Sequence, residues 1–71
     1  RSEKRRQRNM EVRSAVRTYI RRFREAAATG DEEKKLSSFK VAQAAIDKAV
    51  NKGVLKAGTA ARYKSRLAAL L

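Results

Sequence analysis

Apolar side chains recur every three or four positions along three stretches of this chain, which is the spacing of one face of an α-helix. The first pattern consists of Val12, Val16, Tyr19, Ile20, Phe23 and Ala27. The second lies along one helical face made of Leu36, Phe39, Ala42, Gln43, Ile46, Ala49 and Val50. The third consists of Ala60, Tyr63, Leu67, Leu70 and, at the edge of the pattern, Leu71. We therefore predict an all-α fold with helices at roughly residues 2–28, 32–51 and 57–71.

Two glycines mark the ends of the first two predicted helices. Gly30 and Gly53 each suit the left-handed residue that follows a helix, and Asp31 suits the N-cap of the next one. Glu32 and Glu33 then lie in the first turn, where the helix dipole favours anions. We interpret these three acids as a helix start rather than a metal or catalytic cluster, because no His, Cys or further acid accompanies them.

The short turns predict antiparallel neighbours, and therefore a three-helix bundle that forms one domain over residues 1–71. The start of the third helix stays open between Lys56 and a cap at Thr59. An aromatic residue on an apolar stripe is typical of a core. We therefore expect Tyr19, Phe23 and Phe39 to share the core, and we favour this role for Phe39 over that of a platform for base stacking.

The beginning of the first helix lacks an apolar face. When the stripe that starts at residue 12 is projected back, it meets Arg1, Arg5, Arg8 and Asn9. We predict one long helix whose first half extends beyond the core as a basic projection. Without a partner, residues 1 to about 10 should be frayed, because no packing holds them and their like charges repel.

Charge is both large and unevenly distributed. The 71 residues include 19 Lys or Arg and seven Asp or Glu, a formal net charge of +12. Residues 1–24 hold ten basic and two acidic residues, residues 25–52 five of each, and residues 53–71 four basic and no acidic residues. Such self-repulsion indicates an anionic partner. We expect the first and third segments to face a polyanion and the second to serve as a scaffold.

The arginines of the first helix have a face of their own. On a helical wheel we place these five opposite the apolar stripe: Arg6, Arg13, Arg17, Arg21 and Arg24. They lack balancing acids, and a guanidinium binds phosphate in a bidentate manner and stacks on bases. This face indicates phosphate contact, as in a folded RNA, more than plain solvation.

Catalysis and metal binding have little support. The chain has no His and no Cys, which removes the usual zinc ligands and any disulfide. Its serines have no base partner and no glycine-rich phosphate loop occurs. No apolar run approaches the ~20 residues that span a bilayer. We predict no enzyme, no cofactor, no metal site and no membrane partner.

The region around the third helix carries the most specific motif. Residues 52–55 read KGVL and residues 59–67 read TAARYKSRL, which resembles the bacterial-type small ribosomal subunit protein 20 family. The basic start with Asn9 and Ser14, and the AIDKA sequence at residues 45–49, fit the same family. The resemblance covers nearly the whole chain. It departs at Lys56-Ala57-Gly58, where the family usually has His-Lys-Asn.

The resemblance implies a three-helix bundle with a long first helix, which binds small-subunit rRNA directly and supports assembly. By position, its contacts on the long helix would be Arg5, Arg6, Arg8, Asn9, Arg13 and Arg17. On the third helix they would be Arg62, Lys64, Ser65 and Arg66. To these we add three basic residues from their place on the first helix: Lys4, Arg21 and Arg24.

Two other classes stay open. A general, nucleoid-like nucleic-acid-binding protein would bind DNA and rRNA equally at matched salt. An amphipathic helix on a membrane surface would need its apolar stripe exposed, whereas three similar stripes fit a bundle seam. We favour a ribosomal protein that acts in translation, with rRNA and other ribosomal components as partners and no independent homo-oligomer. Its place would be a ribosome in a bacterial cytoplasm or a chloroplast stroma.

Overall fold

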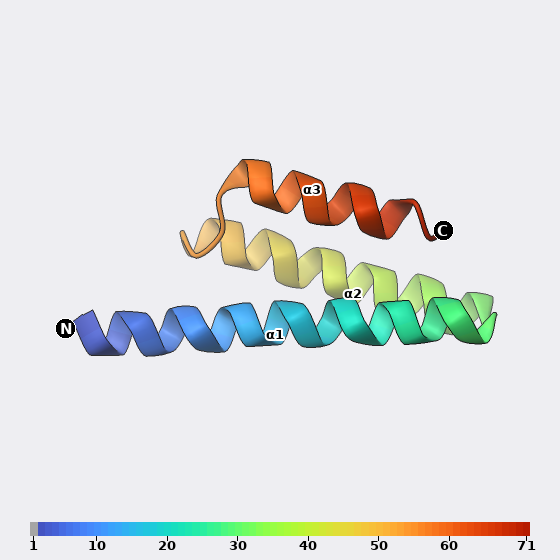
Figure 1. Cartoon of the computed structure of the whole chain (residues 1–71), viewed down its shortest axis with the longest axis horizontal. Coiled ribbons are helices and arrows are strands. Elements are labelled where there is room, and N and C mark those ends of the chain that lie inside the picture. The colour runs from blue at the N-terminus through green and yellow to red at the C-terminus, as the bar shows by residue number, and fades with distance from the viewer. Residues whose placement is uncertain (1) are drawn as a thin grey trace.

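The computed structural model describes residues 2–71, which form helices joined by two turns (Figure 1). Helix α1 spans Ser2–Thr29, α2 spans Glu32–Asn51 and α3 spans Ala57–Ala68. The predicted all-α class and the long first helix are confirmed. Arg1, which the pattern assigned to the projection, lies outside the described residues.

The three helices are stacked side by side. Helix α2 runs antiparallel to α1 and packs along it. Helix α3 then turns back over α2 and runs parallel to α1 (Figure 1). The first turns of α1 extend past the other two helices, and the principal extents are 44 × 19 × 13 Å. A straight 28-residue helix is about 42 Å long at ~1.5 Å per residue. The length of the molecule is therefore the length of α1.

The core lies where α1, α2 and α3 meet. Its largest fully buried side chains are Phe23, Ile46 and Leu67. The Phe23 and Phe39 rings are tilted by 55° with their centroids 5.6 Å apart, as edge-to-face aromatic pairs prefer. The buried residues include several alanines, whose small side chains let the helices approach closely: Ala26, Ala42, Ala49 and Ala60.

The start of α2 departs from the predicted stripe. Leu36 is 51% exposed, so its assignment to the core was wrong. The neighbouring Lys35 lies inside instead, with only 11% of its side chain exposed. Its Nζ donates to Glu32 Oε1 at 3.1 Å and to the Leu71 carbonyl oxygen at 3.4 Å. The long apolar stem of a lysine can cover a core while its ammonium group stays near water.

The end of α3 also differs from the prediction. The helix ends at Ala68, and the Leu70 and Leu71 N–H groups donate to the Leu67 and Ala68 carbonyl oxygens in a closing turn. Leu70 is 45% and Leu71 is 51% exposed. Neither leucine belongs to the buried stripe, because the chain leaves the helix before it can present them to the core.

The predicted helix ends are found at the turns. Gly30 and Gly53 have φ values of 78° and 76°, in the left-handed region where glycine has no steric penalty. The Asp31 carboxylate accepts a hydrogen bond from the Lys34 N–H at 3.1 Å, which confirms its N-cap role. Helix α3 begins at Ala57 with Lys56 as an N-cap that makes no side-chain bond. The alternative start at Thr59 is therefore wrong.

Candidate nucleic-acid interface

The first part of the candidate interface is the projecting start of α1, residues 3–11. Every side chain from residue 3 to residue 11 is exposed. This stretch carries five of the predicted contacts: Lys4, Arg5, Arg6, Arg8 and Asn9. The ion pairs of the described residues lie elsewhere in the molecule. At ~100° per residue the cations of the projection occupy roughly half of the helix circumference, and the remaining arc carries Glu3 and Gln7.

The second part is a row of arginines along the packed half of α1. Arg13, Arg17, Arg21 and Arg24 border hollows that open toward α3. The sequence placed this row opposite the apolar stripe, and that placement was wrong. At ~100° per residue the row lies roughly a quarter-turn from the stripe rather than across the helix. The arginines consequently flank the core, and α3 forms the facing wall.

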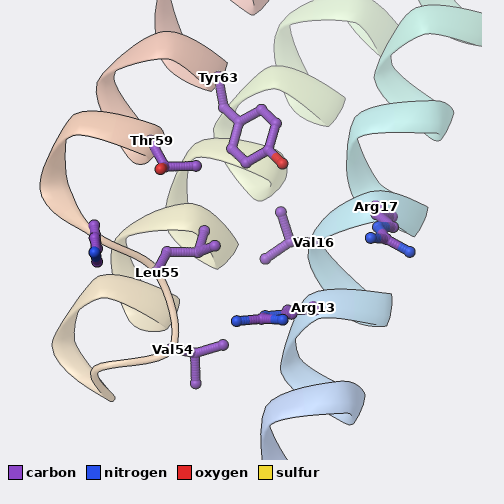
Figure 2. A pocket seen from close by; sticks show the side chains of 8 residues that line it. Arg13, Val16, Arg17, Val54, Leu55, Thr59 and Tyr63 are labelled. Carbon is purple, nitrogen blue, oxygen red and sulfur yellow. The ribbon is translucent and has the colours of Figure 1, made fainter.

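One hollow lies between the middle of α1 and the start of α3. It is a cavity of about 360 Å³ lined by Arg13, Val16, Arg17, Val54, Leu55, Lys56, Thr59 and Tyr63. Figure 2 shows Arg13 reaching from α1 toward Val54 and Leu55, whereas the Arg17 guanidinium stays beside its own helix. Two cationic side chains of α1 thus border an apolar floor.

The groove continues along α1 toward its C-terminal end. A second hollow lies among Ile20, Arg21, Arg24 and Tyr63, and a third is bordered by Arg24 on α1 and Arg66 on α3. No carboxylate is among the residues that line these three hollows. Guanidinium groups therefore flank an open groove whose side-chain charges are all positive. Its electrostatics favour an anion. Arg21 has one nearby acid, because its Nε lies 4.0 Å from Glu25 Oε1, so the expectation that the arginine row lacks balancing acids was wrong at this position.

The α3 residues predicted from the resemblance do not gather in one place. Of the four, Arg66 borders the groove. Lys64 faces the other way and forms an ion pair with Asp47 on α2, which leaves 35% of its side chain exposed. Arg62 and Ser65 are exposed and lie on the outer side of α3 by helical spacing. Lys64 therefore ties α3 to α2.

Sequence reasoning missed three residues of the hollow between the middle of α1 and the start of α3, namely Lys56, Thr59 and Tyr63. Tyr63 was assigned to the apolar stripe, and it does pack against the core while it also lines the groove. Thr59 and Tyr63 are four residues apart, so they share a face of α3. That spacing was readable from the sequence, but which helix this face meets depends on the packing of α3.

The opposite flank of α1 is built differently. The Arg22 guanidinium lies over the Tyr19 ring, 5.7 Å from its centroid. A shallow hollow there is lined by Tyr19, Arg22, Ser37, Ser38 and Val41. Here α2 adds hydroxyl and apolar groups but no further cation. The charge of α1 is thus concentrated on the projection and on the side toward α3.

Fold and surface together define a small, strongly basic helical protein with its cations on one helix and one groove. Within residues 2–71 no helix is long and apolar enough to cross a membrane, and no cluster of His, Cys, Asp or Glu gathers as a metal site would require.

Comparison with known proteins identifies the family within this class. The model of the family ribosomal protein S20 matches residues 1–71. Small ribosomal subunit protein bS20 of Corynebacterium aurimucosum is 55% identical over 67 residues, which cover 94% of this chain and 77% of that protein. The protein of the same name from Frankia casuarinae is 48% identical over 67 residues, 94% of this chain and 75% of that protein. That of Buchnera aphidicola is 47% identical over 66 residues, 93% and 74% of the two chains.

The chain belongs to the ribosomal protein S20 family. The resemblance seen in the third-helix motif is thereby confirmed. The protein is a structural component of the small ribosomal subunit and not an enzyme.

Proposed function

We propose that this protein binds small-subunit rRNA directly and supports assembly of the subunit, with residues 1–71 acting as one RNA-binding domain. The observation that carries the proposal is the arginine row of α1, which continues from the exposed projection into a groove lined by no carboxylate. Phosphates neutralised by such a row release counterions, which makes binding tight and salt-dependent.

The proposed contacts divide into three groups. The projection supplies Lys4, Arg5, Arg6, Arg8 and Asn9. The α1 wall of the groove supplies Arg13, Arg17, Arg21 and Arg24. Helix α3 supplies Arg62, Lys64, Ser65 and Arg66, and of these Lys64 already holds Asp47. We expect Lys64 to contribute least, because its charge is partly balanced and its side chain is half-buried.

The neutral segment supports a division between RNA and protein partners. Residues 25–52 carry as many acids as bases, so α2 has little net attraction for phosphate. We infer that its outer face turns toward other ribosomal components or solvent. We also infer that one copy binds each RNA, because two copies would each bring a charge of +12 to a shared interface. The bacterial origin of the relatives named above favours a bacterial ribosome over that of a chloroplast.

Charge reversal on the projection tests the proposal. Arg5→Glu combined with Arg8→Glu should weaken binding to a small-subunit rRNA fragment at least about tenfold, through lost phosphate contacts. The unfolding transition should stay unchanged, since neither side chain is packed. The matched control, Lys34→Glu with Lys40→Glu, makes the same charge change on exposed positions of α2 and should bind nearly as the wild type does. Equal affinity of the wild type for the rRNA fragment and for random duplex DNA at matched salt would contradict the proposal.

Hydrogen exchange gives an independent measurement. In the free protein the amides of residues 2 to about 10 should exchange much faster than those of residues 16–26, because no tertiary contact protects the projection. Addition of the rRNA fragment should slow exchange in the projection. Exchange that is already slow in the free protein would show that the projection is held without RNA.

A further inference from the structure

We propose that the groove between α1 and α3 holds one unpaired RNA nucleotide, with its base on the apolar floor beside Tyr63 and its phosphate on Arg13. This inference rests on the proposed function and specifies what the groove takes from the RNA. An unpaired nucleotide is a base extruded from a loop or a bulge, so that its faces are free to stack.

The floor of the cavity is the first observation. Val16 is only 3% exposed, and Val54 and Leu55 are half-buried against the core. A duplex backbone presents phosphates and sugars, which gain nothing from an apolar floor. A nucleobase has an apolar face, and base stacking on aromatic side chains tolerates any base. The floor therefore fits a base better than it fits a phosphate.

The walls supply the complementary chemistry. Arg13 extends over the floor from α1, and Tyr63 reaches toward it from α3 with its hydroxyl group directed at the groove (Figure 2). Thr59 adds a second hydroxyl group, and Lys56 a further cation. No carboxylate lines the cavity to repel a phosphate. Its volume of about 360 Å³ lies within the ~300–1,000 Å³ of small-molecule sites.

Blunt-ended RNA duplexes without a loop test this site. One duplex is fully paired, and four others carry a single bulged nucleotide at the same position, one for each base. The wild-type protein should bind the bulged duplexes about tenfold more tightly than the paired one. Tyr63→Leu, which keeps apolar bulk but loses the ring, should abolish that preference and leave the salt dependence in place.

The matched control is the other tyrosine. Tyr19 is likewise half-buried against the core, but its ring pairs with Arg22 on the far flank of α1. Tyr19→Leu should retain the preference for bulged RNA. Circular dichroism melts establish that both variants fold. As a measurement that needs no variant, 5-iodouridine at the bulge should photocrosslink the wild-type protein at Tyr63.

Equal affinity of the wild type for paired and bulged duplexes, or a crosslink that maps outside the groove, would overturn the nucleotide site. The proposed function would survive that result if rRNA binding remained salt-dependent and sensitive to Arg5→Glu with Arg8→Glu. Failure of the wild type to bind any of the duplexes or the rRNA fragment would instead overturn the proposed function.

Discussion

Helix α1 meets its two neighbours in different ways. Against α2 it closes a seam in which Phe23, Ile46 and small alanines are fully buried. Toward α3 it makes few contacts and leaves a groove bordered by arginines. Apolar surface fixes the helix on one side, and the adjacent side keeps its charge accessible. The contrast shows how a chain of 71 residues can bury one side of a helix against a neighbour and leave the adjacent side open.

The seam is where the largest effect on stability is expected. Phe23→Ala should lower the free energy of unfolding by about 3–5 kcal/mol, the usual cost of a buried Phe→Ala change. A small domain has only about 5 kcal/mol or slightly more to lose, so the variant should keep a margin of only about 0–2 kcal/mol. Chemical denaturation followed by circular dichroism measures this. Met10→Ala is the control, because Met10 is 63% exposed on the projection and its loss should change stability by less than about 0.5 kcal/mol.

The groove should respond in the opposite sense, with binding lost and stability kept. Arg13→Gln together with Arg17→Gln should weaken rRNA binding about tenfold or more and lower the slope of log affinity against log salt by about two. Lys34→Gln with Lys40→Gln, the same neutralisation on α2, should leave both quantities near wild type. If Arg13→Gln with Arg17→Gln lowers the melting temperature but leaves the slope of log affinity against log salt unchanged, these arginines serve packing instead.

The turn between α2 and α3 should lose stability when Gly53 is replaced. Its φ of 76° is left-handed, and a Cβ built there meets nothing within 4 Å. Gly53→Ala should therefore cost about 1–2 kcal/mol of unfolding free energy from backbone strain alone. Gly53→Asn should cost less, because asparagine accepts this conformation more readily. If the two variants are equally stable, the α2 end does not depend on the left-handed residue.

The smallest expected effect is a gain at Gly58, in the first turn of the groove wall. Gly58 is helical with no positive φ, and a Cβ there also meets nothing within 4 Å. Gly58→Ala should raise the free energy of unfolding by about 0.5–1 kcal/mol by restricting the unfolded chain. The melting temperature should rise by about 4 °C. A lower melting temperature would mean that α3 does not begin where the structure places it.

Local signals made much of this fold predictable. The caps at Gly30, Asp31 and Gly53 depend on residues within one turn of each helix end, and all three are found as predicted. The core positions of α1 at Val16, Ile20 and Phe23 followed from helical spacing alone. Such features are predictable because the physics that sets them involves only neighbours in sequence.

The wrong predictions concern side chains whose surroundings are set by distant parts of the chain. Leu36 was assigned to the core by its apolar character, yet packing against α1 and the chain end selected the adjacent Lys35. The arginine row was placed opposite the core, but its role depends on where α3 lies. The ion pair of Lys64 with Asp47, which lies on another helix, was not foreseen. Each case needed the relative position of two helices, which helical spacing within one segment does not contain.

The straightness of α1 has a consequence for any RNA bound along it. Its arginines between Arg5 and Arg24 are separated by up to 19 residues of a single helix, a span of about 28 Å at ~1.5 Å per residue. A helix resists shortening and lengthening, because either change breaks its backbone hydrogen bonds. RNA segments that contact the two ends of this row would be kept at a set separation, so α1 would act as a spacer whose length is fixed by its number of residues.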